Sequence, residues 1–285
     1  MSPEPFDLRR FDDPVEFAAL TRPFLLRHEA EHCFFIGHIP TLPTPTDVLL
    51  LAVTDAGGAT VAVALMTPGR HILMTRAPAG AVRAVARHLD AHGIAPPGIQ
   101  APRDVVDEFV RSWRTLTGAV ARSPVSMGIH QATRIFPPAR PAPGKIRTGE
   151  SADLELLERW AAAFAQEIGE PQLADPAITR RRIMKGQLMI WEDGGQAVAM
   201  AGSAGETPNG IRVNAVYTPP PFRNRGYAST LVATLSQQLL DAGRRFCFLY
   251  TDLANPTSNK IYRAIGYEPI AQSTRIEFDH PNERR

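Results

Sequence analysis

Cysteine is scarce in this chain of 285 residues, which has only Cys33 and Cys247, far apart and in no spacing typical of a metal or redox site. A disulfide framework is therefore not expected, and both thiols are expected to be buried as small apolar side chains. Apolar runs long enough to cross a membrane are also missing. The first residues have neither the basic nor the apolar region of a signal peptide. We therefore expect a cytoplasmic protein that does not contact a membrane.

Neither sign of charge dominates, because 31 Lys and Arg residues are balanced by 29 Asp and Glu residues. No long basic run with interleaved aromatic residues occurs, which argues against nucleic acid as a partner and leaves room for one small anionic ligand. A hydrophobic share of 44% and a charged share of 21% are typical of a globular protein. At this length, two domains of ordinary size are expected.

A proline-rich segment at residues 136–145 lies between two stretches of similar pattern. Such a segment cannot be a central strand or a helix interior, so we place a linker there, with domains at 1–135 and 146–285. Each domain carries an expected hairpin, at residues 49–65 and 187–202, with an acidic residue and Gly-Gly at the turn. Each hairpin follows a stretch of helical periodicity. Two copies of one α/β unit are the economical interpretation.

The second copy continues with a strand, a tight loop, a helix and another strand. Residues 211–217 predict a regular strand with Ala215 and Tyr217 on the same face, and three prolines then end it. Apolar residues four apart predict a helix over 226–241, and residues 245–252 favour a second strand. This order and these lengths predict a right-handed parallel crossover.

The loop before the predicted helix has the properties of an anion site. The first amides of a helix have no partners within the helix and lie at the positive end of its dipole. Gly226 lets backbone approach a ligand closely, Ala228 adds little bulk, and Arg223 and Arg225 can supply charge. A short glycine loop alone leaves a plain turn with solvated arginines as an equal alternative.

This loop and a later segment together resemble two motifs of the GNAT family of acyl-CoA-dependent N-acetyltransferases. The first motif is Arg or Gln, two residues, Gly, one residue, then Gly or Ala, and it is matched by Arg223, Gly226 and Ala228. The second is Asn255, followed seven residues later by Tyr262 and then by a Gly-aromatic pair. Two motifs in the right order are more specific than either alone. The sequence around the loop also resembles that of bacterial tandem GNAT proteins whose first half is a degenerate copy.

The resemblance implies an α/β (α+β) fold of two GNAT-like units in tandem, each a mixed twisted sheet flanked by helices. It implies an acetyl-CoA-dependent N-acetyltransferase in which the amine of a small-molecule or peptide acceptor attacks directly in a ternary complex. The first copy lacks the phosphate-loop motif and is expected not to bind coenzyme A. A non-catalytic acyl-CoA-binding regulator is the alternative, and either a monomer or a homodimer is compatible with the sequence.

The resemblance also implies roles for single residues. Tyr262 is implied as the general acid that protonates the departing thiolate of coenzyme A, whereas the structural alternative is a core tyrosine whose hydroxyl has a backbone partner. Ser258 stands where the family usually has alanine. The residues implied to contact coenzyme A lie at the strand end, in the loop and at the start of the last helix: Val216, Tyr217, Thr218, Arg223, Asn224, Arg225, Gly226, Tyr227, Ala228, Ser229, Asn255 and Ser258.

The acceptor side is less well defined by the sequence. An amine must lose a proton before it attacks, and Glu167 and Asp252 are candidate bases, although neither lies in a motif that specifies this role. A basic segment at residues 178–186 could close over a substrate, and a solvated helix face explains it equally well.

A competing motif lies near the start of the chain. His28, Glu29 and His32 form the H-E-x-x-H pattern, which on a helix would place two imidazoles as zinc ligands beside a glutamate base. The chain offers no evident third ligand, and His38 falls one residue too early for the extended motif. A zinc peptidase is therefore a distant third hypothesis, and we expect no metal.

Overall fold

The computed structural model describes residues 6–44 and 46–279, which form two compact units. The first unit takes the chain up to Ile129, together with residues 252–254 and the chain from Ile270 on, and the second takes the remainder. The units are therefore not contiguous in sequence. The division into domains at 1–135 and 146–285, joined by a linker, stays a prediction about segments that fold separately.

The first unit is built on a mixed sheet in the order β1-β2-β3-β4-β5-β13, with β6 paired to β13. Neighbouring strands are antiparallel except β4 and β5. The predicted hairpin at residues 49–65 is confirmed as β2 and β3. The strands begin and end as follows: β1 Phe6–Phe11, β2 Leu49–Asp55, β3 Thr60–Met66, β4 Ile72–Met74, β5 Gly98–Ala101, β6 Val120–Ala121, β7 Val125–Ala132 and β13 Glu268–Asp279.

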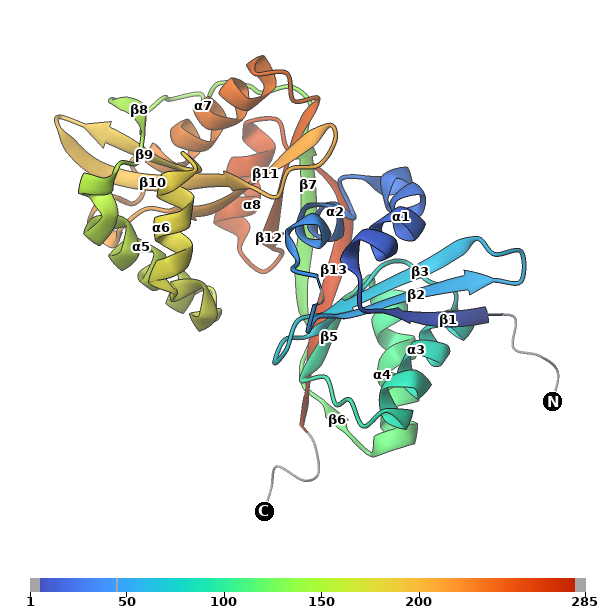
Figure 1. Ribbon diagram of the computed structural model, residues 1–285. Coiled ribbons are helices and arrows are strands. Elements are labelled where there is room, and N and C mark those ends of the chain that lie inside the picture. The colour runs from blue at the N-terminus through green and yellow to red at the C-terminus, as the bar shows by residue number, and fades with distance from the viewer. Residues whose placement is uncertain (1–5, 45, 280–285) are drawn as a thin grey trace. The chain divides into compact units, whose positions relative to one another are not determined.

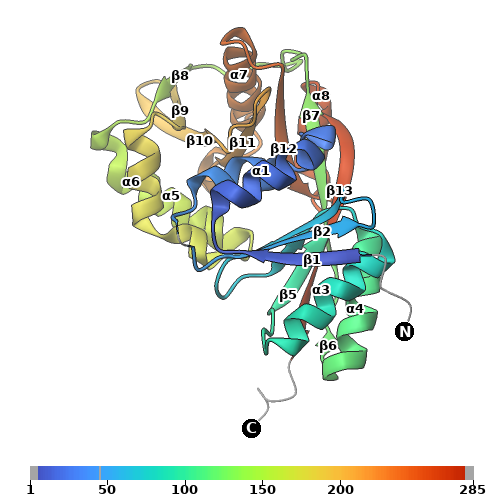
Figure 2. The ribbon, with the colours of Figure 1, turned by 45° about the vertical axis from the view of Figure 1, so that its right-hand side comes forward.

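Helices cover both faces of this sheet, because its strands are apolar on both sides. Leu49 and Leu51 of β2 pack with α3 (Ala79–Ala91) and α4 (Arg103–Thr117), and the alternate residue Leu50 packs on the opposite side with α1 (Pro14–Leu25) and α2 (Cys33–His38). Figure 2 shows α1 on one side of β1 and β2 and α3 on the other. The last strand takes part in this core, since Ile276 and Phe278 of β13 lie in the layer below α3 and α4.

The second unit repeats the same order of elements: one strand, two helices, three strands, a helix, a strand and a helix (Figure 1). Its strands follow the order β12-β11-β10-β9-β8, and only β11 and β12 are parallel. The predicted tandem of two α/β units and the predicted parallel crossover are confirmed. The strand bounds are β8 Lys145–Thr148, β9 Leu188–Asp193, β10 Gln196–Ala204, β11 Gly210–Tyr217 and β12 Phe246–Asp252.

Two helices lie on each face of the second sheet as well. Leu157 and Trp160 of α5 (Leu154–Glu167) pack with Ile190 and Met200 on one face, which α6 (Pro176–Met184) also covers. On the other face, α7 (Tyr227–Asp241) buries its stripe of leucines beside α8 (Pro256–Ala264). The helix predicted over 226–241 is therefore confirmed to within one residue.

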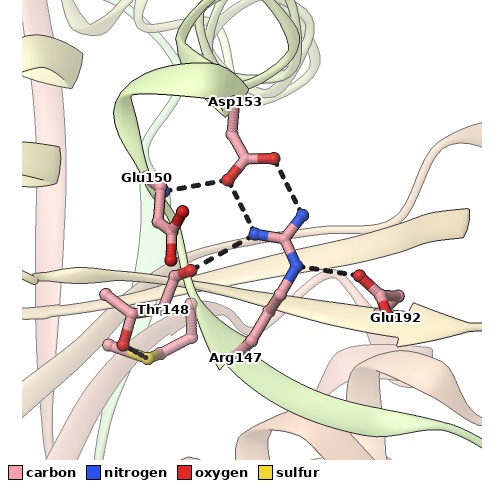
Figure 3. Close-up of polar contacts among 6 residues, drawn as sticks. Arg147, Thr148, Glu150, Asp153 and Glu192 are labelled. Atoms are coloured by element: carbon pink, nitrogen blue, oxygen red, sulfur yellow. Dashed lines mark hydrogen bonds and ion pairs between the residues drawn. The ribbon is translucent and has the colours of Figure 1, made fainter. Parts of the chain in front are cut away.

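A cluster of ion pairs fixes the start of α5 over the sheet (Figure 3). The guanidinium of Arg147 in β8 donates two hydrogen bonds to Asp153, at 2.7 and 2.8 Å, and one to Glu192 of β9, at 2.9 Å. The Arg147 hydrogen bonds hold the pKa of Asp153 below its ordinary value. Because Asp153 also accepts a hydrogen bond from the Glu150 amide, one carboxylate joins β8 to the turn that begins α5.

The proline-rich segment has neither helix nor strand before Lys145, as predicted. It nevertheless packs on the second unit. Ala142 is buried, and its amide donates a hydrogen bond to Thr230 Oγ1 at 2.9 Å. The indole of Trp191 donates to the carbonyl of Pro143 at 2.8 Å. Both cysteines of the chain are buried, and neither forms a disulfide. No helix within residues 6–44 and 46–279 is long and apolar enough to cross a bilayer.

Candidate functional site

Strand β11 is interrupted by a bulge at the position where the sequence predicts regular alternation. Against β10, the pairing passes from Gly202 and Asn214 to Met200 and Tyr217, so that β11 holds one residue more than its partner. Ala215 adopts φ +50°, a conformation rare outside glycine. The extra residue turns Tyr217 to the opposite face from the one on which it was predicted, so that prediction is wrong.

The other neighbour of β11 also diverges at this point. The parallel pairing with β12 joins Gly210–Arg212 to Phe246–Phe248 and, in the described part of both strands, extends no further. Backbone groups of β11 beyond Arg212 therefore face β12 without a ladder. In α/β sheets, the carboxyl ends of parallel strands are where ligands bind. The bulge and this divergence therefore interrupt the regular pairing of β11 near that end.

The loop that follows β11 bends through two residues with left-handed backbone. Asn224 has φ +63° and Gly226 has φ +83°, and α7 begins directly after Gly226. No side chain caps the first amides of α7. The hydroxyls of Ser229 and Thr230 instead bond back to the Gly226 carbonyl, each at 2.9 Å. The helix start therefore has the unpaired donors that an anion requires.

The two loop arginines differ in their surroundings. Arg223 donates to the Thr218 carbonyl at 2.8 Å, forms an ion pair with Glu167 and lies over the Tyr217 ring. It therefore holds the loop against the end of α5. Arg225 is exposed beside Tyr227, whose hydroxyl donates to Asp193. That hydrogen bond, together with burial, raises the pKa of Tyr227.

Tyr262 lies in α8 and packs against the core below α7. Its ring is 6.1 Å from that of Tyr267, centroid to centroid. Within the described chain, its hydroxyl forms no hydrogen bond, unlike the Tyr267 hydroxyl, which pairs with Ser236 Oγ at 2.7 Å. Burial raises the pKa of Tyr262 to about 12. This phenol is therefore protonated at neutral pH and has its proton available.

The start of α8 is capped by Asn255. Asn255 Oδ1 accepts a hydrogen bond from the Ser258 amide at 3.1 Å, and Pro256 occupies the first position of the helix. The Asn255 side chain is therefore engaged as a cap. Of the predicted contacts at the strand end, Val216 packs on the α7 side and Tyr217 on the α5 side.

Neither candidate base is free of partners. Glu167 is ion-paired with Arg223, and an oxygen of Asp252 accepts from the Ala254 amide at 2.8 Å. Asp252 also belongs to the first unit, whereas Glu167 belongs to the second. Both assignments stay predictions.

The H-E-x-x-H segment does not form one continuous helix. His28 ends a short 3₁₀ turn, and His32 precedes α2 (Cys33–His38). His32 is buried against Phe24, with Nδ1 3.0 Å from the Leu25 carbonyl oxygen. Among residues 6–44 and 46–279, no group of three His, Cys, Asp or Glu side chains is placed to hold a metal ion. His32 therefore has the geometry of a core residue, whereas His28 is exposed.

A polar pocket of about 380 Å³ lies in the second unit, at the far end of α7 from the loop. Its walls include Lys185, Ser203, Ile211 and Gly243, and Arg244 lines it while paired with Glu206 at 2.9 Å. Since none of the residues predicted to contact coenzyme A lines this pocket, it is separate from the loop and from Tyr262.

A known family model matches the part of the chain that contains the bulge and the loop. Residues 193–276 match the family model described as FR47-like protein, and these residues include the bulge, the loop and Tyr262. No curated protein matches the sequence significantly.

Solved structures share the fold over nearly the whole chain. A GCN5-related N-acetyltransferase from Sphaerobacter thermophilus is 16% identical, with a TM-score of 0.66, 99% of this chain covered and 98% of that one. A tandem GNAT protein from the clavulanic acid biosynthesis pathway is 13% identical, with a TM-score of 0.62 and coverage of 96% and 98%. A GNAT acetyltransferase from Colwellia psychrerythraea is 12% identical, with a TM-score of 0.56 and coverage of 96% and 100%. These matches confirm the predicted resemblance and the predicted fold.

Proposed function

We propose that the second unit is an N-acetyltransferase that transfers the acetyl group of acetyl-CoA to an amine. One observation carries the proposal: β11 loses regular pairing with both neighbours around Ala215, directly before a loop and helix start with unpaired amides. A bulge at that point re-aims the backbone beside a ligand. Similarity to acetyltransferase structures supports the same activity.

The unpaired amides and the positive charge at the loop support binding of coenzyme A there. The amides of residues 225–229 and the exposed Arg225 would hold the pyrophosphate, and the backbone of Val216–Thr218 would hold the pantetheine arm. A Cβ atom at Gly226 would find its nearest heavy atom, the Arg140 carbonyl oxygen, at 3.5 Å, so glycine is required there mainly by its φ. When bound, acetyl-CoA supplies an acetyl group activated as a thioester.

The chain's own groups would manage the protons. Tyr262 would donate its phenolic proton to the sulfur as the carbon–sulfur bond breaks, since its hydroxyl has no competing acceptor and stays protonated at neutral pH. The acceptor amine must give up a proton in turn. Glu167 is a candidate for that step, and it would have to leave its ion pair with Arg223.

The experiment is acetyl transfer by the purified full chain, with release of free thiol measured against a panel of amino acids, peptides and amino sugars. We expect turnover with at least one class, and one binding site for coenzyme A per chain in calorimetry. Binding without turnover of any amine would favour the acyl-CoA-binding regulator. No binding of coenzyme A would contradict both.

A further inference from the structure

Arg182, in the last turn of α6, is a partly buried cation with no acidic partner. Its guanidinium donates a hydrogen bond to Asn214 Oδ1 of β11, at 2.6 Å, and forms no ion pair with a carboxylate of the described chain. The neighbouring Arg180 differs, because it is paired with Glu158 at 3.2 Å. Of the three arginines in the basic segment predicted as a lid or a solvated face, Arg182 is the one that donates a hydrogen bond to the sheet of the described chain.

The electrostatic surroundings of Arg182 are unfavourable to its charge. Burial, followed by the positive charges of Arg212 and Arg181, lowers the pKa of Arg182 to about 10. No negative group among the described residues offsets this effect. A cation taken out of water without a counter-charge destabilises the fold, and such a charge persists where a ligand supplies the missing anion.

Asn214 adds a second donor without an acceptor. Its oxygen is occupied by Arg182, and its Nδ2 atom is buried with no hydrogen-bond partner in the described chain. Space for this side chain is kept by Gly202, where a Cβ would lie 2.9 Å from Asn214 Oδ1. Two groups with surplus N–H donors therefore lie together, and oxygen acceptors are what both lack.

The position of Asn214 along β11 indicates whether Arg182 and Asn214 would bind the acceptor or coenzyme A. Asn214 directly precedes the bulge at Ala215, while the loop for the pyrophosphate follows the strand end at Tyr217. At about 3.3 Å per residue, the pair lies within a few ångströms of the bulge, on the side away from that loop. An anion here would belong to the acceptor and not to coenzyme A.

We propose that Arg182 and Asn214 bind a carboxylate of the acceptor, so that the substrate is an amine that also carries a carboxylate, such as an amino acid. That the bound molecule is the acceptor rests on the proposed transferase function, whereas the anion site itself rests on the contacts of Arg182 and Asn214. Guanidinium and amide donors suit a carboxylate because they offer planar, charge-assisted hydrogen bonds.

A binding experiment tests the site without any turnover. The melting temperature of the full chain is measured with N-acetyl amino acids and with their neutral carboxamides, for the wild type, Arg182→Gln and the matched control Arg180→Gln. We expect the acids, and not the amides, to raise the melting temperature of the wild type and of Arg180→Gln, because a ligand stabilises the state that binds it. Arg182→Gln should show no such rise. Equal shifts with acids and amides, no shift in the wild type, or an undiminished shift in Arg182→Gln would overturn the inference.

Turnover then separates this inference from the transferase proposal. With amino acids and their amides as acceptors, we expect kcat/KM to favour the acids by roughly 10- to 100-fold, and Arg182→Gln to remove that preference while coenzyme A still binds. O-phosphorylated amino alcohols are tested as a further class of acceptor. If the enzyme prefers them to amino acids, the site binds a phosphate group and the carboxylate assignment is wrong. Acetylation that favours neutral amines would overturn the carboxylate site but not the transferase. Failure to bind coenzyme A would overturn the transferase, and the melting experiment would still decide the anion site.

Discussion

The junction of β4 with α3 and the junction of β11 with α7 occupy the same place in two copies of one unit, yet their backbones are used differently. Both helices have a glycine at or next to their start. A Cβ at Gly80 would lie 2.3 Å from the Phe6 ring, so that glycine makes room for an aromatic side chain of β1. At Gly226 a Cβ would make ordinary van der Waals contacts, the nearest at 3.5 Å, and φ is positive. Gly80 is therefore needed to make room for a neighbouring side chain, whereas Gly226 is needed for its backbone conformation.

The last helices of the two units differ in the same sense. α4 runs from Arg103 to Thr117 and buries Phe109 and Trp113 in the core. α8 runs from Pro256 to Ala264 and has no fully buried residue, and it carries Tyr262 with a free hydroxyl. The first unit uses this helix for packing, whereas the second leaves a polar group available for chemistry.

The largest effect should come from removing the phenolic hydroxyl of Tyr262 in α8. Tyr262→Phe should slow acetyl transfer by about 10²- to 10⁴-fold and leave coenzyme A binding and the fold nearly unchanged. Because the pKa of Tyr262 is raised to about 12, wild-type kcat should not fall through loss of this proton below pH 11. Steady-state kinetics and calorimetry test this, and an equally active variant would assign the tyrosine to packing.

Substitution of Gly226 should give the next largest effect. Gly226→Glu should weaken coenzyme A binding by about 10-fold or more, since it adds strain at positive φ and a negative charge beside the pyrophosphate. Gly226→Ala, which adds strain alone, should weaken it less.

The matched change in the first unit should act on stability only. Gly80→Ala should leave the affinity and the single site per chain unaltered and should destabilise the first unit by about 1–3 kcal/mol through overpacking against Phe6. Calorimetry and urea unfolding measure the two effects. A second coenzyme A site per chain, or weaker binding in Gly80→Ala, would remove the contrast between the copies.

A smaller effect concerns pH and the core of the first unit. Burial lowers the pKa of His32 from 6.5, so the folded state favours the neutral ring. The resulting stability is present above about pH 6.5 and is lost as the pH falls through the folded-state pKa. Urea unfolding should therefore give a lower free energy of unfolding at pH 5 than at pH 7.5. We expect this difference to be smaller in His32→Gln and unchanged in the exposed control His28→Gln. A difference of equal size in both variants would exclude His32 as its cause.

The smallest effect on fold and activity is expected from the removal of metal ions. Protein purified without added zinc should contain far less than one zinc per chain, and chelators should spare both the fold and acetyl transfer, because two imidazoles make an incomplete site. Elemental analysis tests this. Stoichiometric zinc together with chelator-sensitive peptide cleavage would make the first unit the active one.

What the sequence predicted correctly depends on local pattern. The leucines of α7 recur at helical spacing, and the two hairpins carry their own turn residues. The bulge could not be found this way, because Ala215 has no preference for positive φ and its neighbours alternate as in a regular strand. The pairing of Arg223 with Glu167, and of Arg182 with Asn214, joins segments distant in sequence and depends on how the helices pack.

The strand β13 determines when the first unit can be completed. Its residues 270–279 belong to that unit, pair with β5 through Thr274 and Ala101, and place Ile276 and Phe278 in its core. During synthesis on a ribosome, the first unit therefore cannot be completed until β13, which follows the second unit in sequence, has been made. A fragment ending in the proline-rich segment would keep an open strand edge at β5 and an incomplete core, which favours pairing with other chains over folding alone. The first unit thus depends on a segment that is translated after the whole of the second unit's sheet.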